Sequence, residues 1–161
     1  MTEELIRIAI VLVSSTIATM GIIMMYGIDK KVLTWALVSA LISCAGCEIS
    51  MYFGLGFFLS NAIGTALAAG YSDFMAHVLK VPATVMIIPG IVPLVPGGRL
   101  YYTMLGAVQS DMEKFSEYGK SVLLIAAGIA IGIIAVTAIS RPLNNKLNEH
   151  KQKKLANGEN K

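Results

Sequence analysis

The fold is decided by one stretch of the chain, Pro82-Ala-Thr-Val-Met-Ile-Ile-Pro-Gly-Ile-Val-Pro-Leu-Val-Pro-Gly-Gly-Arg-Leu-Tyr-Tyr102. Four prolines and three glycines fall within the 17 residues that end at Gly98, in an otherwise apolar run. A proline inside a helix removes an amide donor and clashes with the preceding turn, at a cost of about 3 kcal/mol. The spacing therefore predicts that no continuous helix passes through Pro89, Pro93 and Pro96.

The composition of the whole chain is that of a membrane protein. Hydrophobic residues make up 55% of it and charged residues 14%, with a mean hydropathy of +0.68, whereas soluble domains carry about 25% charged residues. Each of four uncharged runs approaches the roughly 20 residues that carry a helix across the hydrocarbon core: Ile8–Ile28, Val32–Cys47, Ile49–Ser72 and Ser121–Ser140. The sequence predicts an all-α, polytopic membrane helix bundle.

About five transmembrane segments are expected, of which the fourth is broken by its prolines and glycines. Their approximate ranges are 6–26, 32–49, 52–71, 83–109 and 119–140. We expect residues 1–140 to form the membrane domain and residues 141–161 a basic, flexible, cytoplasmic tail. The tail carries six basic and two acidic residues, a net charge of +4, so the other 140 residues sum to −1. Because the excess charge lies in the tail, no nucleic-acid-binding surface is predicted.

The distribution of basic residues predicts the orientation. Lys and Arg concentrate in cytoplasmic loops, and with five crossings the Lys30-Lys31 turn, the Lys80 loop and the tail share one side. The N-terminus is therefore predicted to lie outside the cell and the C-terminus in the cytoplasm.

Broken backbone in lipid is tolerated only where it is buried in protein or lines a polar cavity. We therefore expect two half-helices that face the bundle interior, one ending near Ile88 and one starting near Pro96. The free amides of Gly97, Gly98 and Arg99 would attract an anion through the helix dipole. The Arg99 guanidinium can also grip a carboxylate. A small carboxylate-bearing solute is the predicted ligand.

Two simpler readings of this segment stay open. The proline-glycine run can be a hinge or a re-entrant plug without ligand contact. Arg99 can instead pair with Glu48 or Asp73, or extend to the membrane interface.

Other polar residues in the apolar runs are weaker candidates. Glu48 and Asp73 are possible coupling groups, since ionisable residues within membranes are often functional, but both fit ordinary interfacial charges. Asn61 is a possible pathway residue, although a hydrogen bond to another helix is the simpler role. Cys44 and Cys47 are expected to be buried free thiols. The sequence holds no metal, phosphate-loop or nucleophile-elbow motif, so we expect neither a cofactor nor enzyme activity.

Small residues recur at helix-packing spacing in two segments, where they let backbones approach closely. They are Ser60, Gly64 and Ala68 in the third segment, and Gly128 and Gly132 in the fifth.

The motif from Ile88 to Met104, preceded by Lys80-Val-Pro-Ala-Thr-Val, resembles the threonine/serine exporter family. The likeness covers roughly residues 5–140, and it is to the small subunit that corresponds to the C-terminal half of full-length exporters. It implies about five spans, export of small amino acids or dicarboxylates, and a larger partner subunit. Pro93, Pro96, Gly97 and Tyr101 occupy matching positions. Together with Gly98 and Arg99 they are the predicted substrate-binding residues.

The sequence thus favours a subunit of a secondary exporter in the bacterial cytoplasmic membrane. A non-transporting regulatory or structural subunit and a homo-oligomeric channel are the alternatives.

Overall fold

The chain is built from helices in the computed structural model, which describes residues 2–27 and 30–158, with side chains for residues 6–27 and 32–140. These described residues contain no strand. In chain order the elements are α1 (Thr2–Met25), α2 (Lys30–Tyr52), α3 (Phe57–Leu79), α4 (Ala83–Ile91), the 3₁₀ turn η1 (Val92–Leu94), α5 (Gly97–Val108) and α6 (Met112–Gly158).

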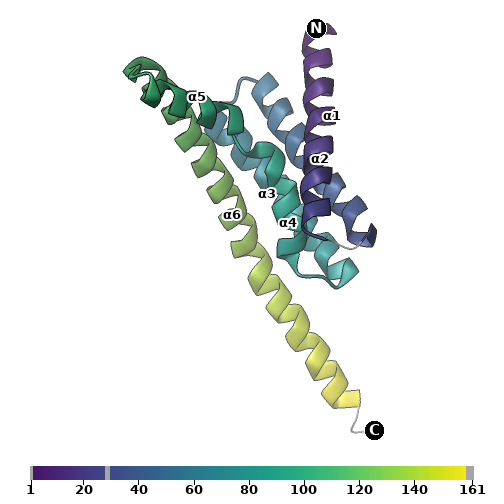
Figure 1. The fold of residues 1–161 in the computed structure, drawn as a ribbon. Coiled ribbons are helices and arrows are strands. Elements are labelled where there is room, and N and C mark those ends of the chain that lie inside the picture. The colour runs from purple at the N-terminus through teal and green to yellow at the C-terminus, as the bar shows by residue number, and fades with distance from the viewer. Residues whose placement is uncertain (1, 28–29, 159–161) are drawn as a thin grey trace.

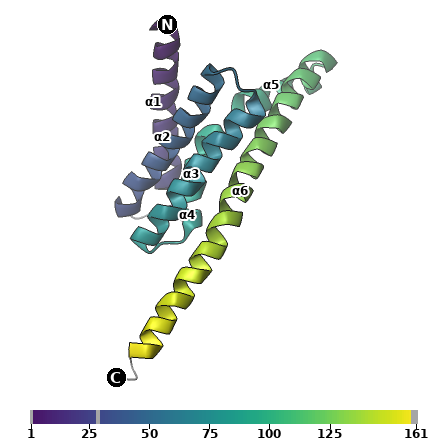
Figure 2. The same cartoon turned by 180° about the vertical axis from the view of Figure 1, so that it is seen from behind.

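Helices α2, α3 and α4 form the middle of the bundle, with α1 on one side and α6 on the other (Figure 1). The view from behind shows the same order, with α3 between α2 and α6 (Figure 2). Helix α5 turns away from α4 and packs on the first part of α6, whose C-terminal part extends far beyond the bundle. The broken segment thus connects the middle of the bundle to α6.

Close backbone packing holds α3 between its neighbours. A Cβ added at Gly132 of α6 would lie 2.7 Å from the carbonyl oxygen of Ala62, and one at Gly128 would collide with that of Phe58. On the other face of α3, a Cβ at Gly64 would lie 2.7 Å from the carbonyl oxygen of Ser43. The predicted role of small residues in helix packing is confirmed at these three glycines.

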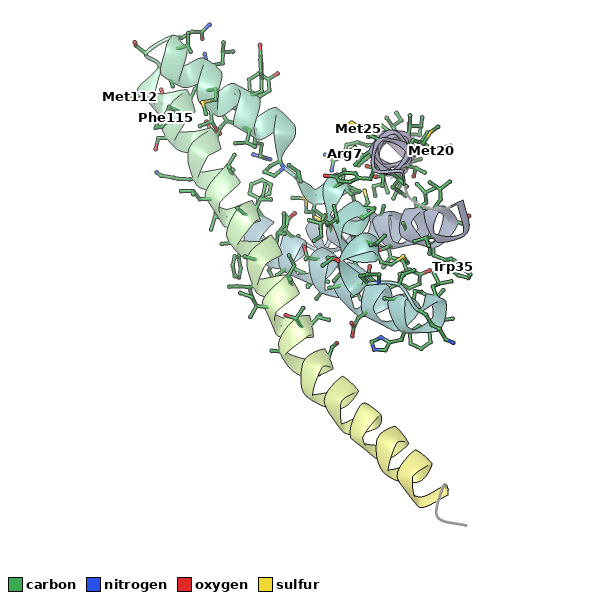
Figure 3. The ribbon with its side chains drawn as sticks, turned by 60° about the horizontal axis from the view of Figure 1, so that its bottom comes forward. Arg7, Met20, Met25, Trp35, Met112 and Phe115 are labelled. Carbon is green, nitrogen blue, oxygen red and sulfur yellow. The ribbon has the colours of Figure 1, made fainter. Side chains whose placement is uncertain are left out.

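The apolar core lies where the first four helices meet. Its buried members are Ile23, Val32, Ala36, Met75, Ala76 and Met86. The outward faces remain apolar as well, as at Ile17 and Met24 of α1, both 68% exposed. In Figure 3, which looks along α1, Met20 points away from the bundle and Arg7 lies nearer to it. An apolar exterior around a packed interior is suited to lipid.

By length and composition, Ile6–Met25, Val32–Tyr52 and Met112–Ser140 can each cross a membrane. The pair Ala83–Leu94 and Gly97–Val108, bent by 56°, counts as a fourth span if it is taken as one. Helix α3 has 23 residues and is not among these spans; it lies inside the bundle and buries the polar side chains of Ser60, Asn61, Thr65 and Ser72. The all-α, polytopic membrane fold with a broken fourth segment is confirmed.

A tight hairpin joins α2 to α3. Helix α2 ends at Tyr52, and Gly54 adopts a left-handed conformation with φ of +79°. Its amide donates to the carbonyl of Met51 at 2.9 Å, and that of Leu55 donates to Ser50 at 3.2 Å. A glycine suits this turn because it pays no Cβ penalty at positive φ.

Three predicted boundaries within the membrane domain were wrong by five residues or more. The third segment begins at Phe57 instead of residue 52, which still belongs to α2. The third segment does not end at residue 71, because Ser72 and Asp73 continue the helix and the His77 ring contacts the Asp73 carbonyl one turn back, at 2.6 Å. The helix stops only at Lys80, whose left-handed backbone returns its amide to Ala76. The fifth segment begins at Met112 instead of 119.

The same helix α6 continues through the predicted tail to Gly158. The tail's flexibility and its cytoplasmic location stay predictions.

Candidate solute-binding site

The backbone of the broken segment leaves the α-helical path between Ile91 and Gly97. Val95 donates to Val92, three residues back, at 3.2 Å, and Gly97 donates to Val95, two residues back, at 2.8 Å. The α-helical pattern resumes where Leu100 donates to Pro96 at 2.9 Å. The predicted break is therefore confirmed. The Arg99 amide has no hydrogen-bond partner in the described part of the chain.

Two details of the break differ from the prediction. The first half-helix runs on to Ile91, because Pro89 is accommodated inside α4 with its ring buried. The prediction of a free amide was wrong for Gly97, since Val95 accepts its hydrogen bond in a tight turn. Pro96 stands just before α5 and so precedes the first helical position.

A side chain of α2 replaces one bond that the break removes. In a 3₁₀ turn an amide pairs with the third residue back instead of the fourth, which deprives the Gly90 carbonyl of its α-helical donor, Leu94. The Ser43 hydroxyl donates to that carbonyl at 2.5 Å. Ser39, one turn away, is hydrogen-bonded to Ser72 of α3 at 2.9 Å. We did not predict these serines; their spacing of four residues among small residues was the available signal.

A cavity of about 270 Å³ opens at the break. Seven of the predicted site residues line it: Glu48, Asn61, Pro93, Pro96, Gly97, Gly98 and Arg99. The remaining wall is formed by Val11, Cys44, Cys47, Met51, Leu94, Val95 and Ile125. Neither Gly97 nor Gly98 has an atom within 4 Å of where a Cβ would stand. Tertiary packing therefore brings residues of α1, α2, α3 and α6 to the exposed backbone of the break.

Two predicted residues lie elsewhere. Tyr101 is 62% exposed, with its ring edge-on to Tyr102 at a centroid distance of 5.4 Å. Asp73 lies 12 residues beyond Asn61 on α3, about 18 Å along the helix axis. Neither lines the cavity at the break.

The charged residues at the cavity are held by specific neighbours. The Arg99 guanidinium stacks over the ring of Phe57, 4.1 Å from its centroid, in the geometry of a cation–π contact. The Glu48 carboxylate is paired with Arg7 of α1 at 3.5 Å. Arg99 therefore pairs with neither Glu48 nor Asp73, the partners that the sequence left open.

The expected hydrogen bond from Asn61 to another helix is not found among the described residues. The Asn61 side-chain amide donates to the Phe57 carbonyl one turn back in α3, at 2.7 Å. This bond fixes its orientation at the cavity wall. Cys44 and Cys47 are free and buried, as predicted.

A second cavity, of about 640 Å³, adjoins the first. Val11, Glu48, Met51 and Arg99 line both, and Arg7, Leu55, Gly56 and Phe57 complete the second. Glu48 and Arg99 thus stand where the two cavities meet.

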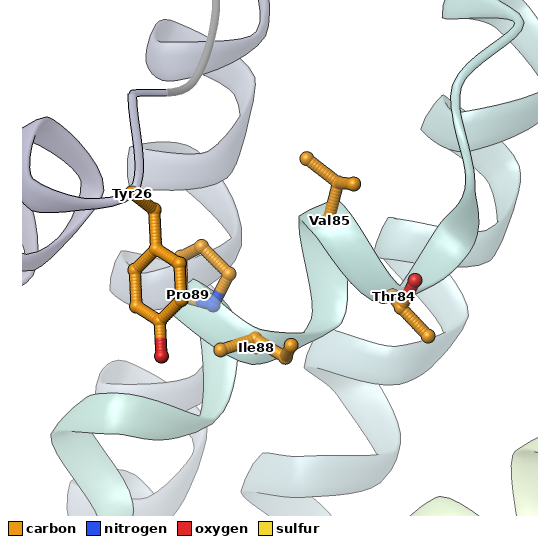
Figure 4. A pocket seen from close by; sticks show the side chains of 5 residues that line it. All are labelled: Tyr26, Thr84, Val85, Ile88 and Pro89. Carbon is orange, nitrogen blue, oxygen red and sulfur yellow. The ribbon is translucent and has the colours of Figure 1, made fainter.

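A smaller cavity, of about 190 Å³, lies at the other end of α4. The Tyr26 ring lies beside Pro89 and Ile88, with Val85 and Thr84 completing the wall (Figure 4). Its lining is apolar and carries no charged group.

Helices that break and expose backbone to a cavity are characteristic of secondary transporters; the fold described above is that of a multi-pass membrane protein. The family model described as "Threonine/Serine exporter, ThrE" matches residues 11–139. The chain belongs to the threonine/serine exporter family, a family of membrane exporters and not of enzymes. No curated protein and no solved structure matches it.

Proposed function

We propose that this chain is the small subunit of a secondary exporter that moves small amino acids or dicarboxylates out of a bacterial cell. The observation that carries the proposal is the cavity at the break, lined by Gly97, Gly98 and Arg99. A helix start with an open amide and a guanidinium attracts a carboxylate. Pro93 and Pro96 keep this backbone from closing into a helix.

The roles of the other residues follow from their positions. Glu48 lines the cavity and is the candidate for ion coupling, whereas Asp73 and Tyr101 do not line it. Asn61 offers a polar atom at the wall opposite the break.

A larger partner subunit is part of the proposal. Among the described side chains of α1, Val11 alone lines the first cavity, and α1 packs chiefly on α2. Many transporters enclose their pathway between two repeats, and a second membrane subunit would supply the missing wall.

The test is transport by membrane vesicles that contain this chain together with the larger subunit that the proposal requires. Uptake of threonine, serine and succinate is measured under a proton gradient and without one. Saturable flux of at least one solute is expected. Vesicles that show no saturable flux of any of the three would refute the exporter assignment, and conductance without saturation would favour a channel.

The proposed orientation places the C-terminus in the cytoplasm and the N-terminus outside. Topology reporters fused after Lys161 and inserted at Asp29 should both read cytoplasmic. Opposite readings would rule out the five-crossing arrangement.

A further inference from the structure

Three charged side chains stand at the junction of the two cavities. Glu48 and Arg99 line both cavities, and Arg7 lines the second one. The Glu48 side chain is 16% exposed and that of Arg7 is 62% exposed. A solute that passes from one cavity to the other must pass Glu48 and Arg99.

The two guanidiniums at this junction differ in their partners. Arg7 is paired with Glu48. Arg99 contacts the Phe57 ring and, within the part of the chain that the structure describes, forms no ion pair. Arg99 therefore faces the cavity with the edge of its guanidinium available to a carboxylate, whereas the charge of Glu48 is already neutralised by Arg7.

We propose that Arg99 and Glu48 form a two-ended site for a zwitterionic α-amino acid, in which Arg99 binds the carboxylate and Glu48 the ammonium. Arg7 occupies the ammonium position when no solute is present. The inference rests on the proposed function and names the class of solute that the same site accepts. The cavity volume of about 270 Å³ lies below the range of about 300–1,000 Å³ for drug-sized ligands, which suits a small amino acid.

Charge balance favours an amino acid over a dicarboxylate. When an ammonium replaces Arg7, Glu48 exchanges one cation for another and stays paired throughout. A dicarboxylate that recruited both arginines would leave Glu48 without a partner in a largely buried position, where an unpaired charge is costly. Glu48 would also repel the second carboxylate. Glu48 is therefore the residue that sets specificity, and Arg7 is the competitor that the solute displaces.

The test is binding to the purified full-length chain in lipid nanodiscs, measured by isothermal titration calorimetry. The ligands are L-threonine, 3-hydroxybutyrate (the threonine skeleton without its amino group) and succinate. The wild-type chain should bind threonine at least about tenfold more tightly than 3-hydroxybutyrate, since a site built for a polar group rejects an analogue that lacks it. Glu48→Gln should bring that ratio close to one.

Two further variants separate specificity from damage to the fold. Arg7→Gln removes the competitor, so threonine should bind more tightly while the preference is kept. Glu117→Gln neutralises an exposed carboxylate at the start of α6 and should leave the ratio unchanged. Retained binding of 3-hydroxybutyrate by Glu48→Gln shows that this variant is folded.

Each contrary result has a distinct meaning. A preference for threonine that survives Glu48→Gln overturns the two-ended site. Tighter wild-type binding of succinate than of threonine also overturns it but leaves an exporter of dicarboxylates standing. Absence of binding by the wild-type chain overturns this inference, whereas the exporter assignment is decided separately by flux in vesicles.

Discussion

The hydroxyl of Ser43 in α2 donates a hydrogen bond to the carbonyl oxygen of Gly90 in α4 at 2.5 Å. A Cβ at Gly90 would collide with the Ser39 hydroxyl and would lie 3.4 Å from the Ala68 Cβ. The glycine allows α4 to approach α2 and α3, and the serine supplies the donor that the 3₁₀ turn withdraws. The break in the helix is thus stabilised from outside the segment that breaks.

We predict that Ser43→Ala lowers the free energy of unfolding by about 1–3 kcal/mol, the cost of leaving a buried carbonyl without its donor. Unfolding in detergent, followed by loss of helicity, measures the change. Ser50→Ala is the matched control, since the Ser50 hydroxyl bonds only to the Gly46 carbonyl of its own helix, at 2.7 Å. Equal effects of the two substitutions would contradict the role given to Ser43.

Gly98→Leu should abolish solute flux while leaving membrane insertion intact. No atom lies within 4 Å of a Cβ at this position, so the leucine enters the cavity without a clash and blocks the backbone of the break. Vesicle uptake and membrane-fraction blotting measure the two effects. Gly70→Leu, at an equally open position on an exposed part of α3, should keep flux. A fully active Gly98→Leu variant would remove the basis for a binding site at the break.

Gly128→Ala should destabilise the chain by about 1–3 kcal/mol, the usual cost of overpacking, because its Cβ would collide with the Phe58 carbonyl of α3. The melting temperature in detergent reports the change. The same substitution at Gly119 of α6 meets only Thr103 Cγ2 at 3.6 Å. Gly119→Ala should be neutral or stabilise by up to about 1 kcal/mol through helix propensity. No change in melting temperature for Gly128→Ala would contradict tight packing of α6 against α3 at this position.

Asp111 should make the start of α6 sensitive to acid. Its Oδ1 accepts a hydrogen bond from the Lys114 amide at 3.1 Å and its Oδ2 pairs with the Lys114 ammonium at 3.0 Å. These bonds, the backbone one first, lower the pKa of the Asp111 carboxyl. Because the pKa of Asp111 is lower in the folded chain than in the unfolded chain, its ionised form stabilises the fold. This stabilisation is present at pH values above the unfolded-state pKa of about 3.9 and is lost as the pH falls through the folded-state pKa.

Hydrogen exchange of the amides in the first turn of α6 measures this effect. Protection should be constant near neutral pH and decrease in acid below about pH 4. Asp111→Asn keeps a capping oxygen without the titration, so its protection should not depend on pH over this range. A wild-type chain that is equally insensitive would show that the cap does not control this end of the helix.

The sequence allowed the break to be predicted because the missing donors of Pro93 and Pro96 are a local property of the chain. The site around it depends on packing. Glu48 and Asn61 reach the same cavity only because α2 and α3 both pass the broken segment, and the pairing of Glu48 with Arg7 joins residues 41 positions apart. The spacing of residues along a single sequence does not indicate a contact between positions so far apart.

Tyr101 shows the limit of the family resemblance in the same way. It follows Arg99 by two residues, which in a helix of 3.6 residues per turn places it about 200° around the axis. With Arg99 at the cavity, Tyr101 points outward. The ends of α3 and α6 were misjudged because Asp73 and Glu113 read as loop residues, although each continues a regular helix in the structure.

The bend of 56° between α4 and α5 also determines the length of the broken segment along the axis of α4. Along the axis of α4, the nine residues of α4 and the three of η1 rise about 20 Å. The twelve residues of α5, about 18 Å long but inclined, add about 10 Å more. The sum is close to the 30 Å thickness of the hydrocarbon core. With α4 parallel to the membrane normal, the two halves therefore reach from one lipid headgroup layer to the other, and the break between them lies within the hydrocarbon core, about 20 Å from one headgroup layer and about 10 Å from the other.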